Sequence, residues 1–254
     1  MSLCKQCVSG KTHQGTPQGT VVKIGGVDCY VGTPAGDYKK DCAVLFLADA
    51  LGMQHLNSQL LVDDFARNGY KVIAPDYFAG EPLPVTVLKN DFSLDPSYDL
   101  GAWVARHNEA SVRPILDKVI EALKTQGVTR FGSTGYCLGG RYVFDLAFEN
   151  ITNVSVASHP SFLKSPEDLQ TYLAESKAPL LLNTCPIDGQ FPPSAQIQAD
   201  EILGEGKFEP GYQREFYDGC EHGFAVRGDL KNELVRRGVE GSFKASVEWF
   251  GRYL

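Results

Sequence analysis

The sequence predicts an α/β protein built on a mostly parallel central sheet with helices on both faces. Apolar runs of strand length alternate with amphipathic helical stretches, the order that produces parallel β-α-β units. The run at 43–50 is almost continuously apolar, which is typical of a strand buried on both faces. The 254 residues contain no composition break, linker or internal repeat. We therefore expect residues 1–254 to form one domain, beginning with a polar segment at 1–20.

The expected elements follow one another in a regular order. Gly25 and Gly26 separate the first two strands and predict a hairpin. Gly69 is a natural cap for the first helix, and Pro75 ends the strand after it. The strands are expected at 21–24, 29–33, 43–50, 71–74, 130–134, 154–157, 179–184 and 214–217. The helices are expected at 57–68, 110–125, 139–149, 166–175, 194–204 and from 229 or 230 to 253.

Two further features of the pattern concern irregular structure. Between 77 and 97, prolines and glycines without a clear period predict a long loop over the sheet, and such loops are often functional. In the last helix, Gly238 or Gly241 is expected to introduce a break.

Composition and charge exclude several kinds of partner. The formal net charge is −7 and the basic residues form no stripe, so we expect no nucleic-acid partner. No apolar run approaches the ~20 residues that span a bilayer. The polar segment at 1–20 lacks the apolar core of a signal peptide. These observations predict a cytoplasmic protein, a monomer or homodimer, that acts on a small molecule without membrane contact.

The cysteines are odd in number and unevenly spaced, at positions 4, 7, 29, 42, 137, 185 and 220. In a chain of this length that pattern favours reduced thiols over a disulfide framework. Cys4 and Cys7, with His13, could begin a metal clip, but a structural zinc site needs a second ligand pair and none follows. We therefore expect no metal.

One cysteine lies in a pattern that carries chemistry. Gly135–Gly139 has the form glycine-x-nucleophile-x-glycine, between a predicted strand and a predicted helix. Such an elbow lifts the nucleophile off a tight turn, and its glycines are needed because bulk would collide with the turn. The helix N-terminus favours a thiolate at Cys137. The alternative, a buried structural cysteine in a glycine-rich turn, is less consistent with the residues that follow.

An acid and a base follow the cysteine in the chain order of the α/β-hydrolase fold. His222 follows the last strand, where the base of that fold belongs, and Asp188 follows the preceding strand and is the expected acid. Asp218 is a weaker substitute for the acid. His159 comes too early for the base, and it either lines the pocket or is an ordinary loop histidine.

These residues predict acyl-transfer chemistry. Cys137 would attack an ester or lactone carbonyl, and water activated by His222 would then release the acyl group. The Leu138 N–H is placed to stabilise the oxyanion, and the Ala50 N–H, in the loop after the strand at 43–50, is the candidate second donor.

At these residues the sequence resembles the dienelactone hydrolase family over nearly the whole chain. The motifs that carry the resemblance are Gly135–Gly140, Asp188 with Phe191-Pro192, His222-Gly223-Phe224 and the stretch from Gly69 to Gly80, and the segment at 13–17 is similar to fungal members. The resemblance implies the α/β-hydrolase fold, a Cys-Asp-His triad, a lactone or related ester as substrate, and no cofactor.

The resemblance also suggests substrate-binding residues. Asp49 stands where bacterial members have a glutamate that helps control the thiol, and Arg227 lies near the place of an arginine that binds the substrate carboxylate. Tyr77, His159 and Phe191 are expected to line the pocket.

Three functions are compatible with these features. The first is hydrolysis of a lactone or small ester, and the second is hydrolysis of a thioester or polyketide-type lactone in secondary metabolism. The third is a non-catalytic binding protein on the same fold. The intact nucleophile, acid, histidine and glycine set argues against the third.

Overall fold

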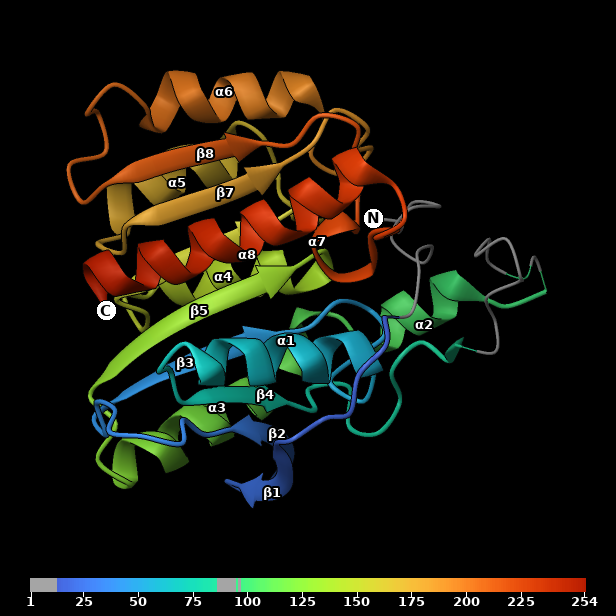
Figure 1. The fold of residues 1–254 in the computed structure, drawn as a ribbon. Coiled ribbons are helices and arrows are strands. Elements are labelled where there is room, and N and C mark those ends of the chain that lie inside the picture. Colours follow the sequence, from blue (N-terminus) through green and yellow to red (C-terminus); the bar gives the residue numbers. More distant parts are fainter. Residues whose placement is uncertain (1–12, 86–94, 96) are drawn as a thin grey trace.

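The structure, a computed structural model, describes residues 13–85, 95 and 97–254, and its centre is one eight-stranded sheet (Figure 1). The strand order is β1-β2-β4-β3-β5-β6-β7-β8. The strands from β3 to β8 that neighbour one another are parallel, whereas β2 pairs antiparallel with both β1 and β4. The strands are β1 (Thr20–Ile24), β2 (Val27–Gly32), β3 (Cys42–Leu47), β4 (Val72–Pro75), β5 (Arg130–Tyr136), β6 (Val154–Ser158), β7 (Leu180–Thr184) and β8 (Tyr212–Phe216).

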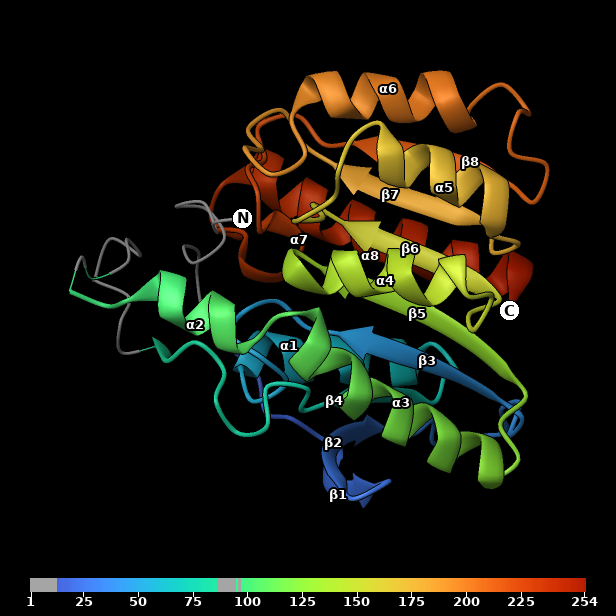
Figure 2. The ribbon, with the colours of Figure 1, turned by 180° about the vertical axis from the view of Figure 1, so that it is seen from behind.

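Helices cover both faces of the sheet. Figure 1 shows α1 and α8 in front of it, and Figure 2, from behind, shows α3, α4 and α5 on the opposite face. The helices are α1 (Leu56–Arg67), α2 (Leu100–Arg106), α3 (Glu109–Thr125), α4 (Leu138–Phe148), α5 (Glu167–Glu175), α6 (Pro193–Leu203), α7 (Phe224–Arg227) and α8 (Glu233–Tyr253). The predicted α/β architecture is therefore confirmed.

The core is divided into two apolar layers by the sheet. Along β3, Ala43, Leu45 and Leu47 pack in the layer that contains α3, α4 and α5, while Val44 and Phe46 pack in the layer of α1 and α8. Because successive side chains of a strand point to opposite faces, a strand buried on both faces must be apolar throughout. This explains the continuous apolar run that predicted β3.

Some element boundaries differ from the sequence-based expectation. β3 ends at Leu47, so residues 48–50 form a loop and not the end of a strand. β5 is longer than expected and continues to Tyr136, directly before the cysteine of the elbow. The short helix α2, where the Asp99 carboxylate accepts from the Ala102 N–H, was not predicted. Of the loop expected at 77–97, residues 86–94 and 96 lie outside the described residues.

The expected break in the last helix was wrong. α8 runs without interruption through Gly238 and Gly241, and the separate short helix α7 precedes it. Both glycines serve close packing: a Cβ at Gly238 would overlap Cys220 Sγ, and one at Gly241 would lie 2.8 Å from a ring carbon of Tyr217. Glycine lowers helix propensity by only ~1 kcal/mol, which tertiary packing of α8 easily offsets.

The described part of the polar N-terminal segment docks on α1. The backbone N–H groups of Gln18 and Gly19 donate to the carboxylate of Asp63, as does the Tyr30 hydroxyl. Asp63 is buried and these donors provide its hydrogen bonds, as a buried carboxylate requires. Among the described helices, none has the combined length and apolar character needed to cross a membrane.

Two alanine substitutions in α8 should differ in their effect on the free energy of unfolding. Gly238→Ala should lower the free energy of unfolding by about 1–3 kcal/mol, because overpacking against Cys220 outweighs the gain in helix propensity. Gly251→Ala is the matched control, because its nearest neighbour, the Tyr70 hydroxyl, would be at 3.4 Å. It should leave stability unchanged or raise it by up to ~1 kcal/mol. Urea denaturation measures both, and equal effects would contradict the packing role of Gly238.

Candidate active site

The candidate catalytic residues lie where parallel strands end. Cys137 directly follows β5, Asp188 comes after β7, and His222 comes after β8. The carboxyl ends of parallel strands meet at one edge of a sheet, so residues distant in the chain are brought together there. All three side chains are buried.

Cys137 occupies a left-handed turn between β5 and α4. Its φ of 52° and ψ of −117° are unusual for a non-glycine residue, and such strain is what the predicted elbow requires. Two backbone hydrogen bonds hold the turn: the Cys137 N–H donates to Ser158 O at 3.2 Å, and the Gly140 N–H donates to Cys137 O at 3.0 Å. The thiol is therefore presented at the N-terminus of α4, where helix N–H groups favour an anion.

The glycines around the elbow allow backbones to approach closely. A Cβ at Gly139 would collide with the carbonyl oxygen of Leu47, at the end of β3, and a Cβ at Gly135 would collide with Gly139 itself. A Cβ at Gly140 would lie 2.6 Å from that of Pro160. The first turn of α4 is thus pressed against the exits of β3 and β6.

Asp188 and His222 form a direct hydrogen-bonded pair. His222 Nδ1 lies 2.8 Å from Asp188 Oδ1, which also accepts from the N–H groups of Gln190 and Phe191 at 2.8 and 3.0 Å. The loops that carry the pair are joined by a β-bridge between Ile187 and Glu221. With Nδ1 facing the carboxylate, Nε2 is the nitrogen left for proton transfer.

A serine that sequence reasoning missed lies between the thiol and the imidazole. Ser161 Oγ is 3.3 Å from Cys137 Sγ and 3.4 Å from His222 Nε2. Ser161 is fully buried, and its N–H donates to Cys137 O at 2.8 Å. The one sequence signal for Ser161 is its position just after β6, the strand that follows α4. That signal is weak.

His159 packs against His222. Its ring centroid lies 4.9 Å from that of His222, in an edge-to-face arrangement, and 5.5 Å from that of Phe224. His159 is fully buried, and its ring nitrogens have no hydrogen-bond partner among the described residues. Burial, with a smaller contribution from the neighbouring His222, holds the pKa of His159 well below its usual range, so the ring stays neutral.

The loop after β3 approaches the elbow from the other side. Asp49 Oδ1 accepts from the Leu51 N–H at 3.0 Å, while no partner for the N–H of Ala50 is found in the described part of the chain. The Tyr77 hydroxyl donates to Ala48 O and so fixes the start of this loop. Burial, followed by the nearby Tyr142 and Cys137, raises the pKa of Tyr77 well above its usual range, so the phenol remains a donor.

Arg227 and Asp49 form a buried ion pair. Arg227 Nη1 contacts Asp49 Oδ2, and the side chains are 2% and 0% exposed. The structure therefore brings together the two residues that the sequence assigned to substrate and thiol. Each side chain therefore neutralises the charge of the other.

The remaining expected site residues take structural positions in the described chain. Phe191 is buried, and its backbone N–H helps to hold Asp188. Leu138 is the first residue of α4, so its N–H lies at the open end of the helix. His13 Nε2 lies 3.0 Å from Gly228 O, while Cys4 and Cys7 lie outside the described residues. In the described ranges, no group of three or more His, Cys, Asp or Glu side chains could hold a metal ion.

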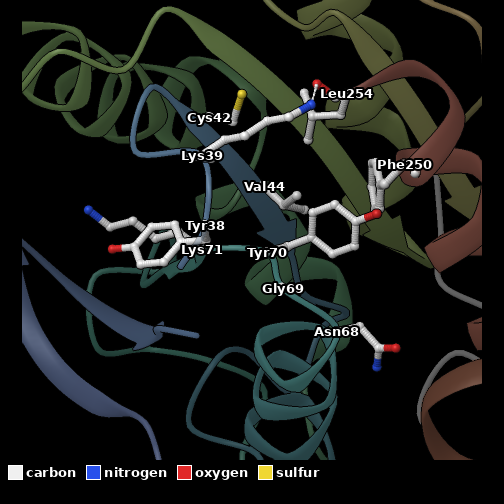
Figure 3. Close-up of a pocket in the computed structure, with 12 residues that line it drawn as sticks. Tyr38, Lys39, Cys42, Val44, Asn68, Gly69, Tyr70, Lys71, Phe250 and Leu254 are labelled. Atoms are coloured by element: carbon white, nitrogen blue, oxygen red, sulfur yellow. Dashed lines mark hydrogen bonds between the residues drawn. The ribbon is translucent and has the colours of Figure 1, made fainter. Parts of the chain in front are cut away.

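A separate pocket opens at the other end of the parallel strands, where β3 begins. Figure 3 shows it between the start of β3, at Cys42 and Val44, and the end of α8, at Phe250 and Leu254. Lys39 Nζ crosses its rim and donates to Leu254 O at 3.2 Å. The elbow follows the end of β5, and β3 runs parallel to β5. The length of a strand therefore separates this pocket from the elbow.

Comparison with known proteins identifies the family of the chain. Residues 27–254 match the dienelactone hydrolase family. The chain is 35% identical over 249 residues to Hydrolase pyvD of Aspergillus violaceofuscus, covering 98% of this chain and 96% of that protein. It is 32% identical over 256 residues to Dienlactone hydrolase 1 of Gibberella moniliformis, covering 99% and 94%.

Solved structures show the same fold. A dienelactone hydrolase structure from Klebsiella pneumoniae aligns with a TM-score of 0.70 at 20% identity, covering 94% of this chain and 99% of that chain. A dienelactone hydrolase from Anabaena variabilis aligns with a TM-score of 0.62 at 17% identity, covering 95% and 100%. The structural alignments show the α/β-hydrolase fold. The family match shows more: the chain belongs to the dienelactone hydrolase family and is a hydrolase of the ester and lactone class.

Proposed function

We propose that this enzyme cleaves an uncharged lactone or small carboxylic ester, with Cys137 as nucleophile, His222 as general base and Asp188 as the group that orients the base. One observation carries the proposal. The Cys137 thiol and His222 Nε2 converge on the same hydroxyl, at 3.3 and 3.4 Å, while Asp188 Oδ1 holds Nδ1 at 2.8 Å. This convergence supports a nucleophile, a base and an orienting acid for covalent acyl transfer.

The first half of the reaction forms an acyl-enzyme. Proton transfer from the thiol to His222 gives a thiolate, which adds to the substrate carbonyl carbon. The N–H groups of Leu138 and Ala50 are the proposed donors to the resulting oxyanion, supported by the close approach of Gly139 to the end of β3. The alcohol oxygen then leaves with the proton from His222, and a thioester to Cys137 remains.

The second half of the reaction releases the carboxylic acid product. His222 takes a proton from a water molecule, which attacks the thioester and expels the Cys137 thiolate. Asp188 stabilises the imidazolium in both halves, and it is held for this task by the N–H groups of Gln190 and Phe191. A thiolate nucleophile must stay reduced, so we propose a reducing compartment such as the cytoplasm.

The charge arrangement supports an uncharged substrate. A substrate carboxylate at Arg227 would have to compete with Asp49, which already neutralises the guanidinium in a buried pair. A neutral ester or lactone can bind without separating Arg227 from Asp49. Tyr77, His159 and Phe191 are proposed as walls of the site, because the first contacts the loop of Ala48, the second the ring of His222 and the third the acid.

Removal of the nucleophile should abolish turnover. Cys137→Ala and His222→Gln should each lower kcat/KM for 4-nitrophenyl acetate by at least ~10³-fold, because each removes a reacting group. Asp188→Asn should cost ~10²–10⁴-fold through loss of the imidazole orientation. Cys42→Ala is the matched control: Cys42 lies in the distant pocket of Figure 3, and burial raises the pKa of its thiol.

Activity of Cys137→Ala equal to that of Cys42→Ala would contradict the proposal. A panel of γ- and δ-lactones, small esters and acyl thioesters then identifies the class of bond cleaved. A preference for thioesters over esters of the same acyl group would replace the proposed substrate by that class.

Substrate charge should affect turnover. We expect kcat/KM for 4-nitrophenyl acetate to exceed that for the mono-4-nitrophenyl ester of succinic acid by about tenfold or more, because the added carboxylate finds Arg227 already paired. The ratio of the two spontaneous hydrolysis rates is the chemical control. A preference for the succinate ester would show that Arg227 exchanges Asp49 for substrate.

The buried ion pair should also contribute to stability. Arg227→Met should lower the free energy of unfolding by about 3–5 kcal/mol, since it leaves the Asp49 carboxylate buried without its partner. The double variant Asp49→Asn, Arg227→Met should recover part of that loss, because no charge is left. Chemical denaturation measures both, and an additive double variant would argue against direct coupling of the pair.

A further inference from the structure

The hydroxyl of Ser161 touches the reacting atoms of both proposed catalytic groups. It lies 3.3 Å from Cys137 Sγ and 3.4 Å from His222 Nε2, and the serine is fully buried. A hydroxyl can donate one hydrogen bond while it accepts another. Ser161 can therefore accept from the thiol and donate to the imidazole at the same time.

The backbone holds Ser161 in this position. Its N–H donates to Cys137 O at 2.8 Å, and the Cys137 N–H donates to Ser158 O at 3.2 Å. The His159 N–H donates to Asn183 O at 2.8 Å, which fastens the same turn to the end of β7. The turn at 158–161 is thus bonded both to the elbow and to the neighbouring strand.

The residues around Ser161 adopt strained conformations. His159 and Phe162 have φ angles of 39° and 64°, in the left-handed region that non-glycine residues seldom adopt. Such strain is energetically unfavourable and is found mainly where a functional group must be positioned. Here the strained positions lie on both sides of the one hydroxyl that joins thiol and imidazole.

We propose that Ser161 is a catalytic residue that relays the thiol proton of Cys137 to His222. The thiol proton moves to Ser161 Oγ while the Oγ proton moves to His222 Nε2. The S–H bond breaks and an N–H bond forms, and the serine is regenerated as a neutral hydroxyl beside a thiolate–imidazolium pair. The inference rests on the proposed function, because it takes Cys137 as the nucleophile and His222 as the base.

Two other roles for the serine make different predictions. A hydroxyl that only fills space predicts that its removal alters stability and leaves thiol reactivity unchanged. A serine that is itself the nucleophile predicts that the acyl group is found on Ser161 and that Cys137→Ala stays active. The relay predicts acylation at Cys137 and a thiol whose reactivity depends on Ser161.

The test measures thiol reactivity directly in the full-length chain. Ser161→Ala and, as a second variant without the hydroxyl, Ser161→Gly are treated with iodoacetamide from pH 5 to 10, and alkylation of Cys137 is followed by mass spectrometry. We expect the rate at pH 7 to fall by ~10²-fold and the pH profile to move toward higher pH, because the thiol loses its path to the base. kcat for 4-nitrophenyl acetate should fall by a similar factor with KM little changed.

Two comparisons make this result specific. Ser161→Thr keeps a hydroxyl and should restore most of the alkylation rate. Ser242→Ala removes a buried hydroxyl that bonds only Val239 O within α8 among the described residues, and it should leave both measurements unchanged. Combining Ser161→Ala with His222→Gln should cost no more than His222→Gln alone, because both act on one proton path.

The outcomes separate the relay from the proposed function. Unchanged alkylation and pH profile in Ser161→Ala would overturn the relay even where Cys137→Ala is inactive. An active Cys137→Ala, or an acyl group trapped on Ser161, would overturn the proposed nucleophile and the relay with it. Lower kcat with unchanged thiol reactivity would also reject the relay.

Discussion

The close contact between the first turn of α4 and the exits of β3 and β6 is the constraint on which the rest of the site depends. It requires backbones to meet where any side chain would collide, at Gly135, Gly139 and Gly140. It also forces Cys137 into a left-handed conformation that only the surrounding hydrogen bonds can maintain. The thiol, the loop of Ala50 and the turn of Ser161 are adjacent because these three backbones touch.

The second half of the site is assembled by pairing between loops. The bridge from Ile187 to Glu221 extends the β7–β8 contact beyond the sheet and aligns Asp188 with His222. The Asp188 carboxylate is fixed by two backbone N–H groups as well as by the imidazole, so its position is well defined. Rigid positioning of this kind comes from the pairing of β7 with β8.

The sequence predicted the parts of the site that depend on chain order. Cys137, Asp188 and His222 each follow a predicted strand, and parallel strands bring such positions to one edge of the sheet. Ser161 could not be predicted in the same way, because its position depends on a turn with left-handed residues that show no composition signal. The pairing of Asp49 with Arg227 joins the loop after β3 to α7, far away in the chain, and neither residue type indicates its partner. The break expected at Gly238 was wrong because glycine there accommodates Cys220, which only the folded packing reveals.

The left-handed elbow has an evolutionary consequence. Glycines and backbone hydrogen bonds set the position of the side chain at residue 137. Neither depends on which atom that side chain carries. Exchange of sulfur for oxygen at position 137 is isosteric to a first approximation, so a lineage can test different nucleophiles on an unchanged scaffold. The same lineage cannot place a side chain at Gly135 or Gly139, because its Cβ would collide with the backbone of the elbow or with the end of β3. Variation in this enzyme should therefore be chemical at position 137 and nearly absent at its flanking glycines.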